Sequence, residues 1–427
     1  MYLRTLELDA FRSYDHLRLT LPPGLTLFIG DNAAGKSNLL EAIAVLAMTR
    51  SPRATTEGEM IGWPAITAAT REEPAVARIA GQAERSQGPV QVEIALVARA
   101  DAQGRPLKSR SGAPLSSKRL RLNGIARRAT EIVGQIGAVL FTTLDIEILT
   151  GPPSRRRRFL DLLIAQSDRG YARAYSTYDK AVTQRNAVLK HMGAGDATAA
   201  ELAPWDDVLA HEGGIILAAR ASAVAALAEL APERHRFLTS GDEAGALRLA
   251  YLPALGPPAL GLPALGPPTL ARGVAPAGDP PDAAAASGLL RDAMAAVRRR
   301  EVGAGTTLVG PHRDDLSLTI DARPAGAYAS RAQQRSVALA LRLAEADLLR
   351  QRTGEAPILL LDDLFSELDV ARREATAAAL ADTLGASPGT AQLLVTTADA
   401  RALPDALPGA TAGFRIADGR VETDDAL

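Results

Sequence analysis

The chain has 427 residues, of which 47% are apolar, and 48 basic residues balance 49 acidic ones to a formal net charge of −1. This length allows two or three domains, and a charge near zero argues against indiscriminate nucleic-acid binding, so any DNA contact has to come from local patches. The absence of cysteine excludes disulfides and thiolate metal sites, and no signal-peptide core or uninterrupted apolar membrane span is found, which predicts a cytoplasmic protein that does not enter a membrane.

The first elements surround a phosphate-binding loop. Residues 1–8 alternate like a strand, residues 25–29 are an apolar run typical of a buried strand, and a helix is expected from residue 37. Between the second strand and the helix stands the G-x-x-x-x-G-K-[ST] pattern. Its members are Gly30, Asp31, Asn32, Ala33, Ala34, Gly35, Lys36 and Ser37.

This context predicts an ATP site with Mg²⁺, although a glycine-containing turn with an exposed lysine is the alternative. Backbone N–H groups at a helix N-terminus would hold the phosphates. Lys36 would supply a positive charge to the β- and γ-phosphates, and the Ser37 hydroxyl would bind Mg²⁺.

A basic hairpin is predicted over residues 118–128, with an Asn-Gly turn at residues 123–124. Alternation places apolar side chains on one face and arginines on the other. These arginines are Arg119, Arg121, Arg127 and Arg128. The strip is either a solvated strand face or a surface for DNA phosphates.

Residues 155 to about 230 have a helical pattern, and four arginines, at 155–158, open it. The helix dipole disfavours cations at an N-terminus. We therefore expect anionic groups opposite: either carboxylates of a structural network or DNA phosphates, with Arg155 and Arg156 as the candidates. Further along, His312 with Asp314 and Asp315 is interpreted as a polar junction rather than a metal site.

Residues 252–288 are rich in proline, glycine and alanine, and Leu-Pro-Ala-Leu-Gly-Pro-Pro occurs in them twice, at 252–258 and 262–268. Proline disfavours helices and central strands. This segment is predicted to be a loop expansion without chemistry, and helix is expected to resume at about residues 288–300.

The C-terminal part supplies the remaining candidate site residues. Ser330 is expected to cap a helix that also carries Gln333. Residues 357–361 form an apolar run that ends in Asp362 and Asp363, and parallel strands of this kind present such carboxylates to the ligand crevice. Asp362 would bind Mg²⁺ directly or through water, and Asp363 would act as general base on the attacking water.

These motifs together resemble the ABC-type ATPase heads of SMC-like proteins: the phosphate loop, the Ser-x-x-Gln signature at residues 330–333, Asp362-Asp363 and the Ser-Glu-Leu-Asp loop at 366–369. Four segments are similar to the branch of this family that acts in recombinational gap repair. They are Phe11-Arg12-Ser13-Tyr14, residues 155–161 with Arg-Arg-x-Phe-Leu-Asp, Gln184-Arg185-Asn186 and residues 310–315. The resemblance covers nearly the whole chain except residues 252–288.

The resemblance implies an α/β fold: an ABC-type ATPase head, with a phosphate-loop NTPase sheet, helices and an antiparallel β subdomain, and an inserted, mainly helical second lobe. The head would comprise residues 1–150 and 306–427, and the lobe residues 151–305. Arg12, Ser330 and Gln333 would contact ATP, with Ser330 gripping the γ-phosphate of the partner in an ATP-dependent homodimer. Alanine at 33 and 332 replaces a glycine common in the family. At 33 this makes the loop slightly stiffer, and at 332 a backbone that needs a positive φ would be strained.

The implied function is ATP-dependent binding to single-stranded and gapped double-stranded DNA, with a weak, DNA-stimulated ATPase. RecR would be the partner, in a pathway with RecO that loads RecA at gaps and serves the SOS response and replication restart. The alternative is an ABC-type nucleotide switch without a DNA role. A structural SMC relative is disfavoured because residues 151–305 are too short and too often broken by proline for long coiled coils.

Overall fold

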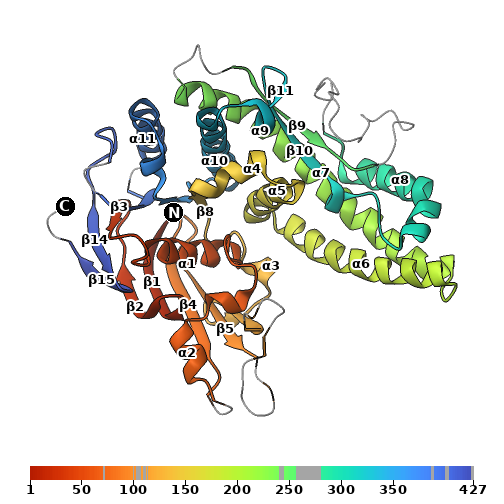
Figure 1. Ribbon diagram of the computed structural model, residues 1–427, viewed down its shortest axis with the longest axis horizontal. Helices are drawn as coiled ribbons and strands as arrows, with labels where there is room; N and C mark the ends of the chain where they lie inside the picture. The colour runs from red at the N-terminus through yellow and green to blue at the C-terminus, as the bar shows by residue number, and fades with distance from the viewer. Residues whose placement is uncertain are drawn as a thin grey trace. The chain divides into compact units, whose positions relative to one another are not determined.

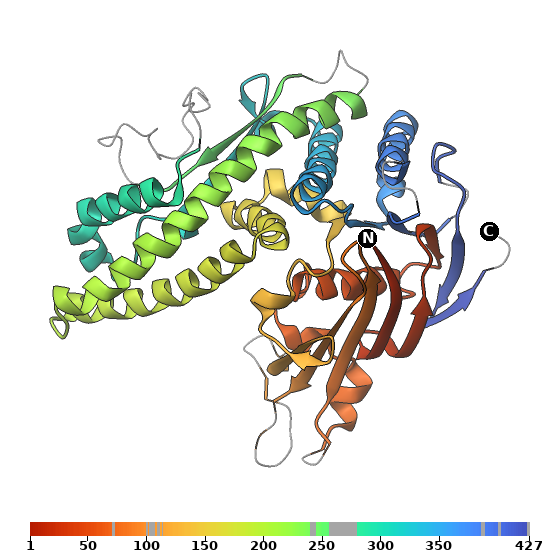
Figure 2. The ribbon, with the colours of Figure 1, turned by 180° about the vertical axis from the view of Figure 1, so that it is seen from behind.

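The structure is a computed structural model that describes residues 1–70, 73–99, 101, 107–108, 112, 114–239, 245–255, 280–385, 389–399 and 403–424. The chain divides into two compact units. The first combines residues 1–144 with residues 345–427, and the second is residues 145–344. In Figures 1 and 2 the first unit is red to orange and blue, and the second is yellow to teal.

A mostly parallel sheet of six strands forms the centre of the first unit. Its order is β15 (Arg420–Thr423), β14 (Ala412–Ala417), β3 (Gly24–Ile29), β13 (Gln392–Thr397), β12 (Ile358–Asp362) and β8 (Ala138–Phe141). All neighbours are parallel except β14 and β15. The carboxyl ends of β3, β12 and β13 therefore lie at one edge, where ligands bind in open α/β sheets.

A second, antiparallel sheet completes the unit. Its order is β2 (Tyr14–Thr20), β1 (Tyr2–Phe11), β4 (Val76–Glu84), β5 (Val90–Ala98), β6 (Ser116–Leu122) and β7 (Ile125–Ala126). Helix α1 (Lys36–Met48) contacts strands of both sheets, and from Leu39 to Met48 every residue is buried. A helix that is apolar all round is stable only when it is enclosed in this way.

The remaining elements of the first unit are short helical turns and helices that connect the strands. They are a 3₁₀ turn η1 (Glu57–Met60), α2 (Trp63–Ala68), α3 (Ala129–Ile132), a 3₁₀ turn η2 (Thr143–Ile146), a 3₁₀ turn η5 (Leu364–Glu367) and α11 (Val370–Gly385).

The second unit is mainly helical and contains a three-stranded sheet. Its helices are α4 (Glu147–Thr150), α5 (Pro153–Ser167), α6 (Arg169–Ala194), α7 (Ala199–Leu238), α8 (Ala283–Ala304), the 3₁₀ turn η4 (Pro311–Arg313), α9 (Ala325–Tyr328) and the first half of α10 (Arg331–Thr353). Its sheet has the order β11 (Arg323–Pro324), β10 (Asp315–Ile320) and β9 (Leu247–Leu252). The expected lobe of residues 151–305 lies inside this unit, which extends to residue 344 because β10 pairs with β9 and packs on α5.

Helix α7 is long and apolar enough to cross a membrane by length and composition alone. It packs along α6, α8 and β9, and its Arg220 is only 1% exposed and forms ion pairs within the unit. These contacts are those of a core helix in a globular unit.

The proline-rich segment is shorter than predicted at both ends. Residues 256–279 lie outside the described residues. Leu252 closes the β9–β10 ladder, and Leu255 is buried. Helix α8 begins at residue 283 rather than 288, because the Asp282 side chain caps it by accepting from the N–H of Ala285 at 2.7 Å and a run of alanines favours helix.

Candidate functional site

The phosphate loop has the backbone conformation that its two glycines predict. Gly35 has φ +114°, and a Cβ there would lie 2.9 Å from Ser13 Oγ and 3.0 Å from Tyr14 Oη. A Cβ at Gly30 would lie 2.2 Å from the carbonyl oxygen of Ile416. Neither position has room for a larger residue.

The two alanines that replace family glycines differ in their surroundings. Ala33 has φ +68°, a left-handed conformation that costs an L-residue about 1–2 kcal/mol. Ala332 lies in α10 and has no positive φ, so the strain expected at residue 332 is absent, whereas residue 33, for which only a stiffer loop was expected, has the strained backbone.

The N-terminus of α1 is built to receive an anion. Within residues 30–48, all of which are described, no side chain caps the helix and no acidic residue occupies its first turn. Lys36 is 7% exposed, and its Nζ donates to the carbonyl oxygens of Gly30 at 2.5 Å and Asp31 at 2.9 Å. Uncapped N–H groups beside a lysine are donors of the kind that phosphate oxygens require, so this loop fits a nucleotide polyphosphate.

Ser37 and Asp362 meet at the edge where β3 and β12 end. The Ser37 hydroxyl donates to Asp362 Oδ1 at 2.8 Å, and Thr396 Oγ1 lies 3.1 Å from the same oxygen. Because the Ser37 proton is used on the carboxylate, the lone pairs of its oxygen stay free for a cation. One hydroxyl and one carboxylate suit Mg²⁺, which keeps several waters and takes its other ligands from phosphates.

Asp363 has a different environment from its neighbour. Its backbone is left-handed, with φ +48°, and its N–H donates to Thr396 Oγ1 at 3.1 Å. Among the residues the structure describes, none donates to its carboxylate, although Ser366 Oγ donates to its carbonyl oxygen at 2.8 Å. A carboxylate that receives no hydrogen bond from the described part of the chain is available at this edge to accept a proton from water.

Arg12 is held by a carboxylate of α1. Its Nη2 and Nε donate to Glu41 at 2.7 and 3.0 Å, and its Nη1 donates to the carbonyl oxygen of Glu59 at 2.8 Å. The Glu41 side chain is 0% exposed and also accepts from Ser51. The structure thus gives Arg12 protein partners, and its contact with nucleotide stays a prediction.

Ser330 and Gln333 form a reciprocal cap on α10. The N–H of Gln333 donates to Ser330 Oγ at 3.2 Å, and the N–H of Ser330 donates to Gln333 Oε1 at 2.9 Å. Ser330 is exposed. The capping geometry agrees with the sequence prediction, and the contact with a partner's nucleotide stays a prediction.

The basic hairpin is present as β6 and β7. Asn123 and Gly124 at its turn have φ +50° and +78°, which suits the tight turn predicted for Asn-Gly. The four candidate arginines are all exposed. Two of them have acidic neighbours: Arg121 lies 3.6 Å from Glu93, and Arg127 lies 3.4 Å from Glu131.

The arginines that open α5 do not share one environment. Arg156 makes a two-pronged ion pair with Asp315, at 2.6 and 3.0 Å, and its side chain is 13% exposed. For this residue the structure favours the carboxylate network over a DNA contact, because both prongs of the guanidinium are occupied. Arg155 is half exposed and pairs with Glu147 at 3.0 Å, while Arg157 donates to the carbonyl oxygen of Asp314.

Two buried arginines hold the second unit together. Arg220, on α7, lies 2.7 Å from Asp161 on α5 and 3.0 Å from Asp314 before β10. The hydroxyls of Tyr171 and Tyr251 donate to the same two carboxylates. Burial raises the pKa of Asp314, and the Arg220 charge opposes that rise.

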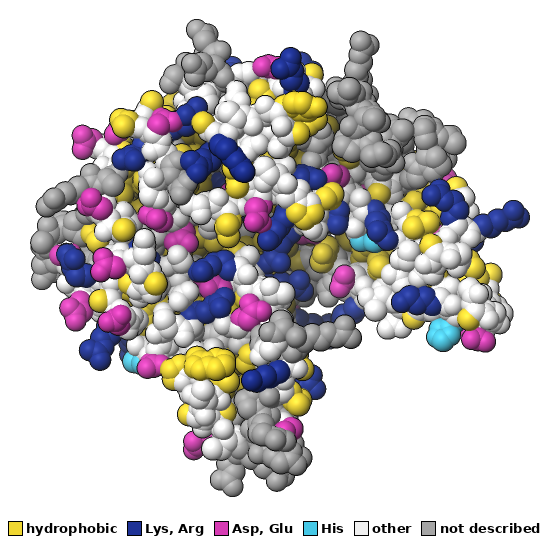
Figure 3. All heavy atoms as spheres, in the orientation of Figure 1, with side chains coloured by type: hydrophobic (Ala, Val, Ile, Leu, Met, Phe, Trp, Pro, Cys, Tyr) yellow, Lys and Arg dark blue, Asp and Glu magenta, His cyan; other side chains and the backbone are white. Residues whose placement is uncertain are grey.

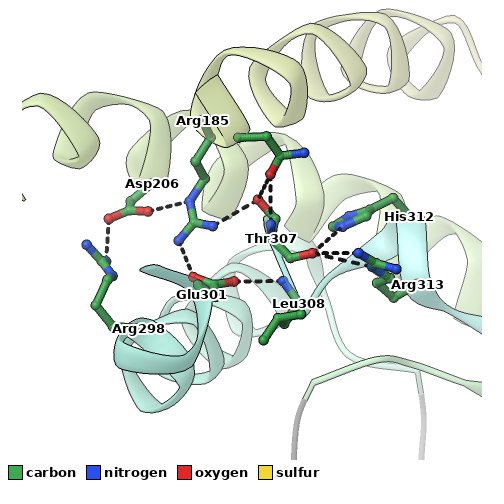
Figure 4. Close-up of polar contacts among 9 residues, drawn as sticks. Arg185, Asp206, Arg298, Glu301, Thr307, Leu308, His312 and Arg313 are labelled. Carbon is green, nitrogen blue, oxygen red and sulfur yellow. Dashed lines mark hydrogen bonds and ion pairs between the residues drawn. The ribbon is translucent and has the colours of Figure 1, made fainter. Parts of the chain in front are cut away.

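The other buried arginine is Arg185, on α6 (Figure 4). It donates to Glu301 on α8 at 2.6 Å, to Asp206 on α7 at 2.8 Å and to Thr307 Oγ1 at 2.9 Å. Glu301 in turn accepts from the N–H of Leu308 at 2.9 Å. Three helices and the following loop are thereby fixed by one guanidinium.

His312 lies beside this cluster, and both of its ring nitrogens are in hydrogen-bond contact with protein groups. Its Nδ1 is 2.9 Å from the Tyr178 hydroxyl. Its Nε2 is 3.2 Å from the Thr307 carbonyl oxygen, a contact that Figure 4 shows. Because a carbonyl only accepts, Nε2 carries the proton and Nδ1 accepts from tyrosine. Burial lowers the pKa of His312 to about 4. No group of three or more potential metal-ligating side chains occurs in the part of the chain that is described.

Sequence reasoning did not assign Glu41, Thr396 or the partners of the buried arginines. Thr396 could have been found, since a hydroxyl at the end of a buried strand beside an Asp-Asp strand is placed to contact it. Glu41 gave a weaker signal: a carboxylate among apolar residues of α1 needs a buried cation.

Comparison with known proteins identifies the class. Residues 2–414 match the family model described as "RecF/RecN/SMC N terminal domain", so the chain is a member of the SMC-like ABC-type ATPase family that its sheets and phosphate loop define.

Within that class the chain belongs to the RecF family. It is 41% identical over 377 residues to "DNA replication and repair protein RecF" of Chloroflexus aurantiacus, covering 87% of this chain and 88% of the relative. A protein of the same name from Herpetosiphon aurantiacus is 42% identical over 88% of this chain and 89% of its own. The solved structure "Structure of the recombination mediator protein RecF-ATP in RecFOR pathway" is 27% identical, with a TM-score of 0.76 over 99% of this chain and 97% of the other.

Proposed function

We propose that this protein binds ATP and Mg²⁺ and uses them to control its binding to gapped and single-stranded DNA during recombinational repair. The observation that carries the proposal is the Ser37–Asp362 hydrogen bond at the uncapped N-terminus of α1, which joins two motifs 325 residues apart. A hydroxyl, a carboxylate and a lysine at one helix N-terminus are what a metal–polyphosphate complex requires. RecF relatives with names in DNA replication and repair, one solved as RecF-ATP, support this choice of ligand and pathway.

In this proposal Lys36 and the loop amides bind the phosphates, and Ser37 with Asp362 holds Mg²⁺. That metal ion would neutralise charge on the phosphates when bound. Asp363, whose carboxylate has no donor among the described residues, accepts a proton from the attacking water. Slow ATP hydrolysis, stimulated by DNA, would then end the DNA-bound state.

We infer that two copies associate on ATP, each presenting Ser330 and Gln333 to the nucleotide of the other. RecR would be the protein partner, and with RecO the outcome would be RecA loading at single-strand gaps, which serves the SOS response and replication restart in the cytoplasm. The exposed arginines of the β6–β7 hairpin are the proposed DNA contacts, together with Arg155. Figure 3 shows basic and acidic side chains interspersed on the face in view, which agrees with a net charge of −1 and favours such local contacts.

Lys36→Ala tests the proposal. We expect the variant to lose ATP binding and, with it, the ATP-dependent increase in affinity for a gapped duplex. Lys36→Arg should do the same, because a guanidinium cannot replace the compact ammonium between Gly30 and Asp31. Near-normal ATP binding, hydrolysis and dimerisation in both variants would exclude the phosphate-loop assignment.

The alternative function, an ABC-type switch without a DNA role, is separated by adding gapped DNA to the wild-type ATPase assay. The proposal expects a higher rate with DNA, and this effect should weaken with rising salt because phosphate contacts are screened. An equal rate of ATP hydrolysis with and without gapped DNA at low salt would favour the alternative.

A further inference from the structure

Thr396, the fifth residue of β13, contacts both aspartates of the proposed ATPase site: the carboxylate of Asp362 and the backbone N–H of Asp363. It is 1% exposed and pairs with Asp362 in the parallel ladder of β12 and β13. Its Oγ1 is 3.1 Å from Asp362 Oδ1 and accepts from the N–H of Asp363 at 3.1 Å. The Leu361 carbonyl oxygen is 3.2 Å away on the same side. A single hydroxyl thus touches three consecutive residues of the strand end.

The chemistry of a hydroxyl fits both contacts at once. It has one proton to donate and two lone pairs to accept with. Accepting from the Asp363 N–H leaves its proton for Asp362 Oδ1, with the Leu361 carbonyl as a competing acceptor. Asp362 Oδ1 then receives two hydroxyls, from Ser37 on one side and Thr396 on the other, and this restricts rotation of the carboxylate.

The contact with Asp363 has a second consequence. At φ +48° this residue is in a conformation that non-glycine residues adopt only when their surroundings hold them there. The Thr396 hydroxyl and the Ser366 hydroxyl contact its N–H and its carbonyl oxygen. The direction of the Asp363 side chain follows from this backbone conformation.

We propose that Thr396 is a positioning residue for ATP hydrolysis: its hydroxyl orients Asp362 for Mg²⁺ and holds Asp363 where its carboxylate can accept a proton from water. The proposal rests on the function proposed above and adds a residue to it. In this proposal Thr396 acts through Asp362 and Asp363, the two residues that its hydroxyl contacts.

The test compares two isosteric variants of the same sheet. Thr396→Val removes the hydroxyl and keeps the β-branched shape. Thr26→Val does the same on β3, where Thr26 is 0% exposed and, among the described residues, its Oγ1 has no hydrogen-bond partner. Thr26 pairs with Leu394 of β13, so the control lies in the same buried layer.

For Thr396→Val we expect the Mg²⁺ concentration that half-saturates ATP hydrolysis to rise about tenfold, since a hydrogen bond to a carboxylate is lost. Turnover at saturating Mg²⁺ should also fall about tenfold, because the Asp363 backbone loses a partner. ATP binding in EDTA should stay as in wild type. Thr396→Ser should restore both values, and Thr26→Val should match wild type in both.

Equal Mg²⁺ requirement and turnover in Thr396→Val and Thr26→Val would overturn the assignment, and so would a Thr396→Ser variant as defective as Thr396→Val. If Thr396→Val does not fold, Thr396→Ala removes the same hydroxyl with more room to relax, and the same comparison decides. Wild type is measured first. If it shows no Mg²⁺-dependent hydrolysis, the proposed function fails and Thr396 with it, whereas active wild type with an unaffected Thr396→Val rejects Thr396 alone.

Discussion

At the residue scale, two adjacent aspartates have separate environments that suit separate tasks. Asp362 accepts from Ser37 and Thr396, while the carboxylate of Asp363 accepts from none of the residues described. The sequence predicted that both carboxylates follow the end of a buried strand, and their separate roles in binding Mg²⁺ and activating water stay a prediction. The buried arginines could not be predicted in the same way, because Arg185 meets Thr307 across 122 residues and only tertiary packing brings them together.

Asp363→Asn should retain ATP binding and slow hydrolysis by about 10²–10⁴-fold, the usual contribution of a general base. Asparagine tolerates the left-handed backbone at this position, so the variant changes the chemistry and keeps the conformation. Asp362→Asn should instead weaken the use of Mg²⁺-ATP. Single-turnover hydrolysis and sizing chromatography with ATP check both variants. A wild-type rate of hydrolysis in Asp363→Asn would show that Asp363 is not the general base. A dimer of this variant that stays trapped with ATP bound would support the assignment of Asp363 as the base.

His312 predicts a pH-dependent stability of the second unit. Its pKa is lowered from 6.5 to about 4, chiefly by burial, so between these values the unfolded chain binds a proton that the folded chain does not. The stability that the folded state gains by keeping His312 neutral is fully present above pH 6.5. It is lost as the pH falls toward 4, which lowers the free energy of unfolding by about 3 kcal/mol. Between pH 7.5 and 4.5 the unfolding free energy of wild type should fall by about 2–3 kcal/mol more than that of His312→Gln, because glutamine does not titrate. Parallel curves would contradict the buried, neutral state of His312.

At the element scale, the strongest local signals gave the right elements. The buried strands, the Asn-Gly hairpin and the Ser330 cap were all predicted from pattern and turn chemistry. Helix α8 begins five residues before the predicted start at residue 288, because Asp282 followed by four alanines is a helix start signal that acts in spite of the prolines before it. The length of the second unit was underestimated because the pairing of β9 with β10 joins segments that are distant in the sequence.

Ser330→Arg should block ATP-dependent dimerisation and leave ATP binding by the monomer intact. Arginine removes the cap of α10 and fills the space that a partner's phosphates need. Thr198→Arg is the matched control, because Thr198 and Glu201 form the same kind of reciprocal cap on α7 in the same unit.

Light scattering during an ATP titration reports dimerisation, and each cap loss should cost about 1 kcal/mol of stability. If both variants dimerise with the affinity of wild type, Ser330 only caps its own helix and does not contact the nucleotide of the partner. Impaired dimerisation in both would point to a general loss of stability.

At the scale of the whole molecule, the arrangement into an ATPase head with a helical second unit followed from motif order, and the comparisons confirm the family. The boundaries of the proline-rich segment could not be predicted from the sequence, since composition alone does not show which residues pack against the rest of the unit. Leu255 is buried although prolines surround it in the sequence, and its neighbour Ala254 donates to Asp314 Oδ1 at 2.7 Å.

Two deletions test where this segment ends. Replacing residues 256–279 by a short Gly/Ser bridge should leave ATPase activity and DNA binding largely intact, because the free energy of closing a connection between two fixed ends depends only weakly on its length. Replacing residues 252–288 should destabilise the second unit by several kcal/mol, about 1 from the lost Asp282 cap and about 2 from Leu255. Thermal unfolding of both proteins gives the comparison. Equal stability would mean that the flanking residues contribute nothing, and loss of DNA binding in the shorter deletion would assign a function to the segment.

The strand order of the first unit has a consequence for how the protein is made. Strand β3, which leads into the phosphate loop, lies between β14 and β13, and both come from the last part of the chain. A ribosome that adds 5–20 residues per second needs about 20–70 seconds to pass from β3 to the end of β13. During that interval β3 lacks both of its strand neighbours, and α1 lacks the contacts that it makes with β12 and β13, so apolar surface of both elements stays exposed to chaperones and to aggregation. A chain terminated before β13 therefore lacks both strands that hold β3 in place, and the phosphate loop that follows β3 cannot be fixed in its sheet until β13 and β14 have been translated.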